Sequence, residues 1–252
     1  MLGGSTERVL GAEGDRALAS VAPDWPQWRG PRRDGISTER GLLPQWPDGG
    51  PPLSWLATGL GAGYGSPIVV GDSIYITGDV GDESMVVALG LDGSERWRKA
   101  NGAGWKKSFP GSRSTCCYDE GRLYVMNAQG RLACLSADDG SQLWSVNVFE
   151  RFESANITWG ISESVLVDGK AVFVTPVGQK ALMAALDKLT GETLWATPAL
   201  PGEEVSYASA ILVDVGGRRQ LINCGAHYVF GVDAGSGALL WQHPHSVPGW
   251  AV

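Results

Sequence analysis

Residues that could carry out chemistry are few in this sequence, and their spacing matches no catalytic or metal-binding motif. There is no CxxC pair and no cluster of cysteine and histidine with zinc-ligand spacing. No serine–histidine–aspartate order, Walker loop, HExxH motif or kinase signature is present. The glycine-rich stretch 61–65 leads into no helix whose amides would hold a phosphate. The sequence therefore predicts no catalytic set.

The elements that position any site follow from a tryptophan that returns four times behind the same short phrase. Trp97, Trp144, Trp195 and Trp241 are 47, 51 and 46 residues apart. A fixed period of this size indicates one supersecondary unit copied in tandem. Each tryptophan follows a glycine by four residues, and these glycines are Gly93, Gly140, Gly191 and Gly237.

Each repeat has the pattern of four short strands. In the unit that ends at Trp195, β-branched and apolar runs at 164–167, 171–175, 181–186 and 192–195 alternate with turn signals. Four antiparallel strands in a unit of this length make one propeller blade. The sequence therefore predicts an all-β propeller with blades at about 59–99, 110–147, 159–197 and 205–243, and no long helix.

The recurring tryptophan has a mechanical interpretation. A large aromatic ring on the outer strand, inserted against the next blade, buries roughly 200 Å². At about 25 cal/mol per Å², each contact between blades is stabilised by several kcal/mol. The preceding glycine permits a left-handed turn. The turn of the first blade is one residue short (88–93), so we expect it to be tighter.

The N-terminal part of the chain fits the same scheme. The segment 52–56, with Trp55, is predicted to be an outer strand that completes the last blade and closes the ring. The Pro- and Trp-rich segment 24–52 is predicted to be an irregular cover, because proline disfavours central strands. Residues 1–23 are expected either to be disordered or to result from a wrongly assigned start of translation (a mis-started N-terminus). They lack the apolar stretch of a secretory signal.

The C-terminal residues 244–252 have the position of a lead into a further blade within the propeller domain 53–252. Propellers have roughly four to eight blades. Four blades and a closing strand therefore indicate a fragment of a seven- or eight-bladed ring. Two alternatives stay open: two copies of the chain pair into an eight-bladed ring, or four blades close alone.

The phrase AALDKLTGETLW at 184–195 resembles the AxDxxTGxxxW docking motif of PQQ-like propeller repeats. That family includes quinoprotein alcohol dehydrogenases and BamB-like outer-membrane assembly proteins. The stretches at 25–31, 110–115 and 159–164 resemble a narrower branch, the BamB-like, PQQ-binding-like repeat proteins of planctomycete-type bacteria. The resemblance implies a periplasmic or other extracytoplasmic location, although this chain has no visible signal peptide.

The resemblance also raises PQQ and calcium as cofactors. In the dehydrogenases, adjacent cysteines form a disulfide over the cofactor in a loop before a first strand. Cys116 and Cys117 fall instead within the strand, one on each face, where buried cysteine acts as a small hydrophobe. Cys134 and Cys224, which also lie in strands, are likewise interpreted as structural residues without a cofactor role.

A calcium site needs clustered carboxylate and amide oxygens. The candidates Glu163, Asn156 and Glu204 lie in three different loops at no diagnostic spacing. Glu163 could equally cap a strand or pair with Arg113. We therefore expect no cofactor.

The segments that lead into the first strand of each blade meet on one face of a propeller. They carry aromatic residues interleaved with charges, a composition found in interaction surfaces. Several of these residues could equally plug the mouth of the channel. His227, between strands, is expected to be structural. The predicted binding face comprises Trp105, Arg113, Asn156, Trp159, Glu163, Tyr207 and Trp250.

The net charge and hydropathy limit the classes of partner that the protein could bind. The net charge is −7 and the pI is about 5.0, without a basic cluster, so nucleic acid is not expected as a partner. No run of eighteen apolar residues predicts a membrane span. Three functions follow: a non-catalytic scaffold that binds a protein partner in the cell envelope, a PQQ- and calcium-dependent alcohol dehydrogenase, or a ligand-binding sensor module of a larger receptor.

Overall fold

The computed structural model describes residues 6–7 and 24–245, and within them the regular elements are strands apart from one short helix. The predicted disordered or mis-started N-terminus, apart from residues 6–7, lies outside the described residues. So do 246–252 of the predicted further blade, with Trp250. No helix among the described residues is long and apolar enough to span a membrane.

Sixteen of the strands form four antiparallel sheets, each paired in chain order. We call these sheets blades 1 to 4. Blade 1 contains β3 (Ile68–Val70), β4 (Ser73–Val80), β5 (Glu83–Gly90) and β6 (Glu95–Ala103). Blade 2 contains β7 (Cys117–Asp119), β8 (Arg122–Met126), β9 (Arg131–Ser136) and β10 (Gln142–Asn147). Blade 3 contains β11 (Leu166–Asp168), β12 (Ala171–Val174), β13 (Ala184–Asp187) and β14 (Thr193–Ala196). Blade 4 contains β15 (Ile211–Val215), β16 (Arg218–Cys224), β17 (Tyr228–Asp233) and β18 (Leu239–Pro244).

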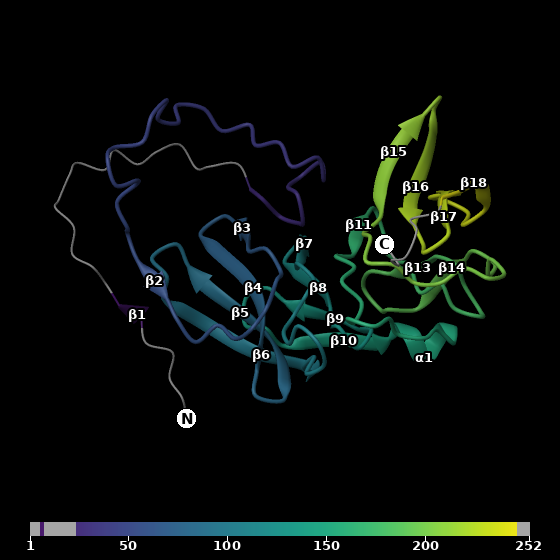
Figure 1. The fold of residues 1–252 in the computed structure, drawn as a ribbon, viewed down its shortest axis with the longest axis horizontal. Coiled ribbons are helices and arrows are strands. Elements are labelled where there is room, and N and C mark those ends of the chain that lie inside the picture. Colours follow the sequence, from purple (N-terminus) through teal and green to yellow (C-terminus); the bar gives the residue numbers. More distant parts are fainter. Residues whose placement is uncertain (1–5, 8–23, 246–252) are drawn as a thin grey trace.

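The blades follow one another in an arc (Figure 1). The first strands β3, β7, β11 and β15 face the inside of the arc, and the fourth strands face outward. The predicted all-β fold with four-stranded antiparallel blades is confirmed, and it is consistent with part of a β-propeller ring.

The hairpin between the third and fourth strands repeats in detail. A register shift falls just before or beside the tryptophan in every blade. In blades 2 to 4 the amide of the turn glycine donates to the carbonyl of the residue four positions earlier, as the amide of Gly140 does to the carbonyl of Ser136. In blade 1, Gly93 donates to Gly90, three residues back. The turn that is one residue short is therefore the tighter one. The four glycines have φ between +70° and +81°, where a side chain is strained.

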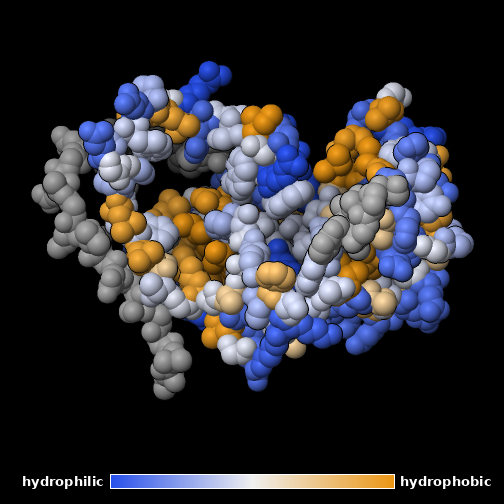
Figure 2. Space-filling view, viewed as in Figure 1, coloured by the Kyte–Doolittle hydropathy of each residue, from blue (hydrophilic) through white to orange (hydrophobic). Residues whose placement is uncertain are grey.

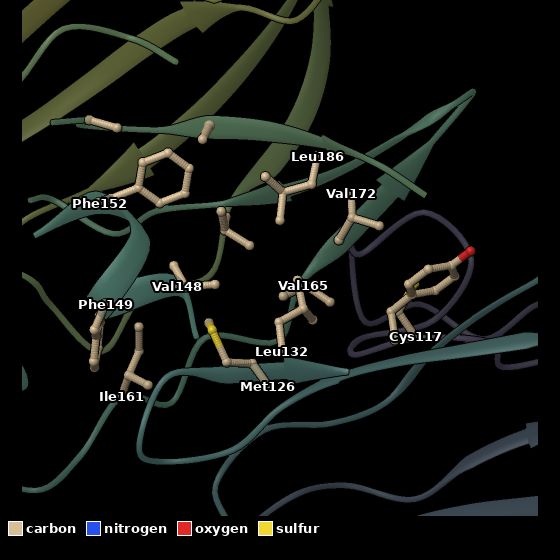
Figure 3. Packing of buried hydrophobic residues seen from close by; sticks show 14 of the residues in the cluster. Cys117, Met126, Leu132, Val148, Phe149, Phe152, Ile161, Val165, Val172 and Leu186 are labelled. Atoms are coloured by element: carbon tan, nitrogen blue, oxygen red, sulfur yellow. The ribbon is translucent and has the colours of Figure 1, made fainter. Parts of the chain in front are cut away.

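Apolar side chains fill the space between successive blades. Between blades 2 and 3, Met126 and Leu132 lie across the layer from Val172 and Leu186, and Phe149, Phe152 and Ile161 lie at the end of the cluster away from Cys117 (Figure 3). Similar clusters lie between blades 1 and 2 and between blades 3 and 4. The core of the protein is thus a series of interblade layers.

The adjacent cysteines belong to two different layers. Cys116 packs between blades 1 and 2, and Cys117 packs between blades 2 and 3. Both are free thiols. Burial raises the pKa of Cys116 to about 12 and that of Cys117 to about 11. These thiols are therefore protonated packing groups at neutral pH.

The segment that begins at Asp24 runs along the first strands. Trp25 exchanges two backbone hydrogen bonds with Val69 of β3, of 2.7 and 3.1 Å, and Pro26 accepts one from Tyr118 of β7. The buried Arg33 donates to the carbonyl of Ser164, just before β11, at 2.8 Å. Beyond this point the chain up to Trp55 has no strand. It arches away from blade 1 and leaves a hollow (Figures 1 and 2).

Two features differ from the sequence expectation. The strand predicted at 52–56 is reduced to β2 (Leu56–Ala57), which pairs with β1 (Thr6–Glu7) and not with a blade. The connection after β10 contains a helical turn, α1 (Val148–Phe152), whose amides are capped by Asn147. An asparagine before a five-residue helix gives too short a pattern to be detected by periodicity.

Candidate functional site

The outer-strand tryptophans lie on the turn glycines of the following blades. A Cβ atom at Gly140 would lie 2.6 Å from Cε3 of Trp97, and Trp97 Nε1 donates to the carbonyl of Ala137 at 3.0 Å. Trp144 lies on Gly191 and donates to Lys188 at 3.0 Å. Trp195 lies on Gly237, again leaving no room for a Cβ atom.

Two tryptophans stand at the ends of this series. Trp55 lies on Gly93 of blade 1 and donates to the carbonyl of Leu91 at 2.8 Å. Trp55 thus occupies on blade 1 the position that the tryptophan of the preceding blade occupies on blades 2 to 4. Trp241 is 38% exposed and donates to Gln220 of its own blade at 2.8 Å.

The segments that lead into the four first strands meet in one aromatic cleft of about 550 Å³. We call it the axial cleft. Four of its residues come from equivalent places, because each stands four residues before the first residue of its blade's first strand: Tyr64, Arg113, Ser162 and Tyr207. Phe109 and Trp159 complete the lining.

The rings of the axial cleft are held in fixed mutual positions. Trp159 and Tyr207 lie with centroids 5.6 Å apart and planes tilted by 30°. Phe109 meets Trp159 edge to face at 6.1 Å. The backbone amide of Trp159 donates to the Tyr207 hydroxyl at 3.3 Å. Phe109 and Tyr64 are each 62% exposed, so the cleft presents aromatic faces to solvent.

Arg113 braces this arrangement. Its guanidinium donates to the carbonyls of Trp159, Gly111 and Phe109, the last two at 3.1 and 2.6 Å. Its Cζ lies 5.5 Å from the ring centroid of Tyr64. Partial burial lowers the pKa of Arg113, but the group stays charged. The side chain therefore ties three of the converging segments together.

The structure brings together three of the predicted face residues, Arg113, Trp159 and Tyr207. Trp105 is buried beneath the Arg113 guanidinium, 5.6 Å from ring centroid to Cζ, and does not line the cleft. Asn156 is exposed and holds its own loop, because Oδ1 accepts the amides of Ile157 and Ile161.

Sequence reasoning missed Tyr64 and Ser162 as lining residues, whereas Phe109 lies in one of the segments expected to form the binding face. Tyr64 lies in the glycine-rich stretch 61–65, whose composition suggests only a phosphate-binding loop. Alignment of the repeats on their first strands would have found it, since Tyr64 and Tyr207 occupy the same place in blades 1 and 4.

Glu163 is buried away from the cleft. Its two carboxylate oxygens accept hydrogen bonds from the hydroxyl and the amide of Thr175, at 2.7 and 3.0 Å. Burial raises the pKa of Glu163 to about 7, against the weaker opposing effect of those hydrogen bonds and of nearby Arg33. In the described part of the structure it forms no ion pair with Arg113, so the considered pairing is wrong.

The oxygen donors do not fit a calcium–quinone site. Glu163 is committed to Thr175, the Asn156 Oδ1 to backbone amides, and Glu204 is exposed on another loop. The residues that line the axial cleft include no carboxylate. Across residues 24–245, no group of three histidine, cysteine or acidic side chains is arranged to hold a metal ion. The cleft is built for packing and stacking.

Solved structures with a similar fold are much longer than this chain. A quinohemoprotein alcohol dehydrogenase from Pseudomonas putida is 14% identical, with a TM-score of 0.54 over 71% of this chain and 34% of its own. The enzyme from Comamonas testosteroni is 15% identical, with a TM-score of 0.50 over 93% and 51%. BamB from Moraxella catarrhalis is 17% identical, with a TM-score of 0.48 over 74% and 53%. This chain thus spans about half or less of the structures it matches.

At these identities the solved structures show the fold alone. A comparison with curated proteins gave no match. The sequence model of one family, described as outer membrane protein assembly factor BamB, matches residues 82–249, which is most of the chain. Together with the four blades, this match shows that the chain belongs to the family of outer membrane protein assembly factor BamB, a family of PQQ-like repeat β-propellers.

Proposed function

We propose that the protein is a non-catalytic scaffold of the cell envelope, which binds an extended segment of a protein partner in the axial cleft. The observation that carries the proposal is the convergence of Tyr64, Arg113, Ser162 and Tyr207, from equivalent places in four blades, on one cleft without a carboxylate. The family description, an assembly factor of the outer membrane, supports the location and the class of partner.

The chemistry of the cleft suits a peptide. Exposed aromatic rings that are already fixed in position lose little entropy on binding, and they are the residues that dominate protein interfaces. The donors of Arg113 are engaged by loop carbonyls, so the cleft offers aromatic ring faces more than free charge. A volume of about 550 Å³ accommodates a few side chains of one extended strand.

The dehydrogenase remains the competing function, because the fold of quinohemoprotein alcohol dehydrogenases also matches. Its chemistry requires a cation site and a catalytic base beside the cofactor. Neither the cleft lining nor Glu163 provides these groups. Cys116 and Cys117 are free thiols buried in two different interblade layers, so they form no disulfide over the cleft.

A selection from random twelve-residue peptides tests the proposal. We expect enrichment of peptides with spaced aromatic or aliphatic residues, with micromolar affinity. Tyr64→Ala should weaken the best peptide about tenfold or more, since truncation of an aromatic anchor costs at least 1–2 kcal/mol. Trp46→Ala, at an exposed aromatic outside the cleft, should leave the affinity unchanged.

A parallel titration with PQQ and calcium tests the competing function. Stoichiometric uptake, followed by absorbance, together with dye reduction in the presence of an alcohol would overturn the scaffold proposal. Peptide binding that is indifferent to PQQ and calcium would support it.

A further inference from the structure

A second hollow, of about 600 Å³, lies between blades 3 and 4. The hollow is bordered by hairpin turns at 168–170, 217–218 and 233–235. In an antiparallel blade these turns lie at the end of the strands opposite the start of the first strand, so the hollow and the axial cleft are at opposite ends of the blades. We call this hollow the interblade groove. Its lining includes Lys170, Phe173, Trp195, Arg218, Arg219 and Ala234.

The joint between blades 2 and 3 shows how such a space is normally filled. The hydroxyl of Tyr124 and Nε1 of Trp144 both donate to the carbonyl of Lys188, at 3.1 and 3.0 Å. The ammonium of Lys188 reaches back to Asp119 and Glu120 of blade 2, at 2.5 and 2.9 Å. One tyrosine, one tryptophan and one lysine thus seal this joint.

The joint between blades 1 and 2 is sealed differently. Tyr75 and Trp97 donate to the carbonyl of Ala137, at 3.3 and 3.0 Å. No lysine stands here, but the ring of Tyr118 stacks on Tyr75 with centroids 6.4 Å apart. A tyrosine of the following blade takes up the space.

Neither device is present between blades 3 and 4. Phe173 holds the register position of Tyr75 and Tyr124 but has no hydroxyl. Ala234 follows the third strand of blade 4 as Lys188 follows that of blade 3. Leu212 stands where Tyr118 stands in blade 2. Among the described residues, Nε1 of Trp195 has no hydrogen-bond acceptor, whereas its counterparts Trp97 and Trp144 each donate to a turn carbonyl. The groove therefore follows from missing side-chain atoms.

The polar rim of the groove favours an anion. Of its two carboxylates, Asp168 is paired with Arg219 at 2.8 Å, and Asp233 Oδ1 accepts from the amides of the turn, that of Ser236 at 2.9 Å. Arg218 lies 3.7 Å from the other oxygen of Asp233, a loose pair. Lys170 has no ion pair in the described part of the chain. Three cations face two engaged carboxylates, in a chain with a net charge of −7.

We propose that the interblade groove binds a small organic carboxylate with an aromatic or aliphatic body. The carboxylate lies between Lys170 and Arg218, and the body rests on Phe173 and Trp195. Nε1 of Trp195 donates to an oxygen of the ligand. The size agrees with that of small-molecule sites in general, about 300–1,000 Å³.

Calorimetry and ligand-observed NMR with 3-phenylpropionate test this site directly. We expect saturable binding of one ligand per chain, with a dissociation constant of about 1 mM or tighter. The neutral amide of the same acid should bind at least about fivefold more weakly, because it lacks the charge. Absence of saturable carboxylate binding, or equal binding of the amide, would overturn the proposal.

Variants separate the groove from the rest of the surface. Lys170→Gln and Arg218→Gln should each weaken binding about threefold to tenfold. Ala234→Lys should abolish binding, because the longer side chain fills the groove. Lys180→Gln, whose lysine pairs with Glu153 away from the groove, should bind as the wild type does. Unchanged affinity in Ala234→Lys would contradict the assignment. Tyr64→Ala, which tests the axial cleft, should not alter binding here.

Discussion

The indole of Trp55 lies on Gly93 in the same way as that of Trp97 lies on Gly140, although Trp55 belongs to no blade of the described structure. A Cβ atom at either glycine would lie 2.6 Å from Cε3 of the ring. Both indoles also donate to a carbonyl of the same turn, on Leu91 and Ala137. Trp55 therefore already occupies the position on Gly93 of blade 1 where the tryptophan of a preceding blade would pack. A second copy of the chain would have to displace Trp55 before its Trp241 could pack there.

Truncation of the tryptophans should destabilise the fold in proportion to their burial. Trp97 is 9% exposed and Trp241 is 38% exposed. Trp97→Ala should lower the free energy of unfolding by about 3–5 kcal/mol, and Trp241→Ala by about 1 kcal/mol. Trp46→Ala, at an exposed ring, should change it by less than about 0.5 kcal/mol. Urea unfolding measures all three, and coincident transitions would remove the docking role from these residues.

A side chain at a turn glycine should be harmful only where a tryptophan covers it. Gly140 and Gly169 both have positive φ, +70° and +57°, but nothing lies within 4 Å of a Cβ at Gly169. Gly169→Ala should cost about 1–2 kcal/mol from backbone strain alone. Gly140→Ala should cost several kcal/mol, because Trp97 must also move. Thermal unfolding of the pair checks this, and equal losses would show that the indole contributes no constraint.

The N-terminal segment should be anchored by Arg33. Its buried guanidinium donates to Ser164 and Val165, at 2.8 and 3.2 Å, and thereby joins the segment to blade 3. Arg33→Gln should cost about 2–4 kcal/mol, because buried carbonyls lose their donors. It should also expose the segment 24–52 to limited proteolysis. Arg32→Gln is the matched control, since Arg32 is exposed and pairs with its near neighbour Asp34. Similar digestion of the two variants would exclude the anchor.

Stability should depend on pH through Glu163. Its pKa is about 7 in the folded state and 4.5 in the ordinary state, so the folded protein holds this proton more tightly than the unfolded chain. The free energy of unfolding therefore falls as the pH rises from about 4.5 to 7, by about 2–3 kcal/mol from this group, and is level above that range.

Glu163→Gln removes the titration and leaves an oxygen to accept from Thr175. The wild type should lose about 2 kcal/mol of unfolding free energy between pH 5 and pH 8 that this variant does not lose, as measured by urea unfolding at both pH values. Glu204→Gln, at an exposed carboxylate, should show no such difference. A pH-independent gap between wild type and Glu163→Gln would contradict the protonated state of Glu163.

The repeat could be predicted because its signals are local. Glycine four residues before tryptophan marks the turn and the outer strand within one short phrase, and it recurs often enough to exclude chance. The tighter turn at Gly93 was visible for the same reason, as one missing residue. Cys116 and Cys117 could be interpreted from alternation alone, which sends neighbours in a strand to opposite faces.

The site could be predicted only in part, because its residues meet across blades. Arg113, Trp159 and Tyr207 could be predicted from the composition of their segments, and Tyr64 only from an alignment of the repeats on their first strands. Nothing in the sequence shows that Trp105 lies beneath the cleft. The interblade groove is harder still. It depends on what Phe173 and Ala234 lack, and this is seen only when the joints are compared in space.

The most direct test of the scaffold function is where a bound peptide lies. A photoreactive phenylalanine analogue at position 64, in the axial cleft, and the same analogue at position 46, outside it, would be irradiated with the selected peptide. The proposal predicts efficient crosslinking from position 64, little from position 46, and no effect of PQQ and calcium. Equal crosslinking from both positions, or loss of the position-64 crosslink when PQQ and calcium bind, would contradict it.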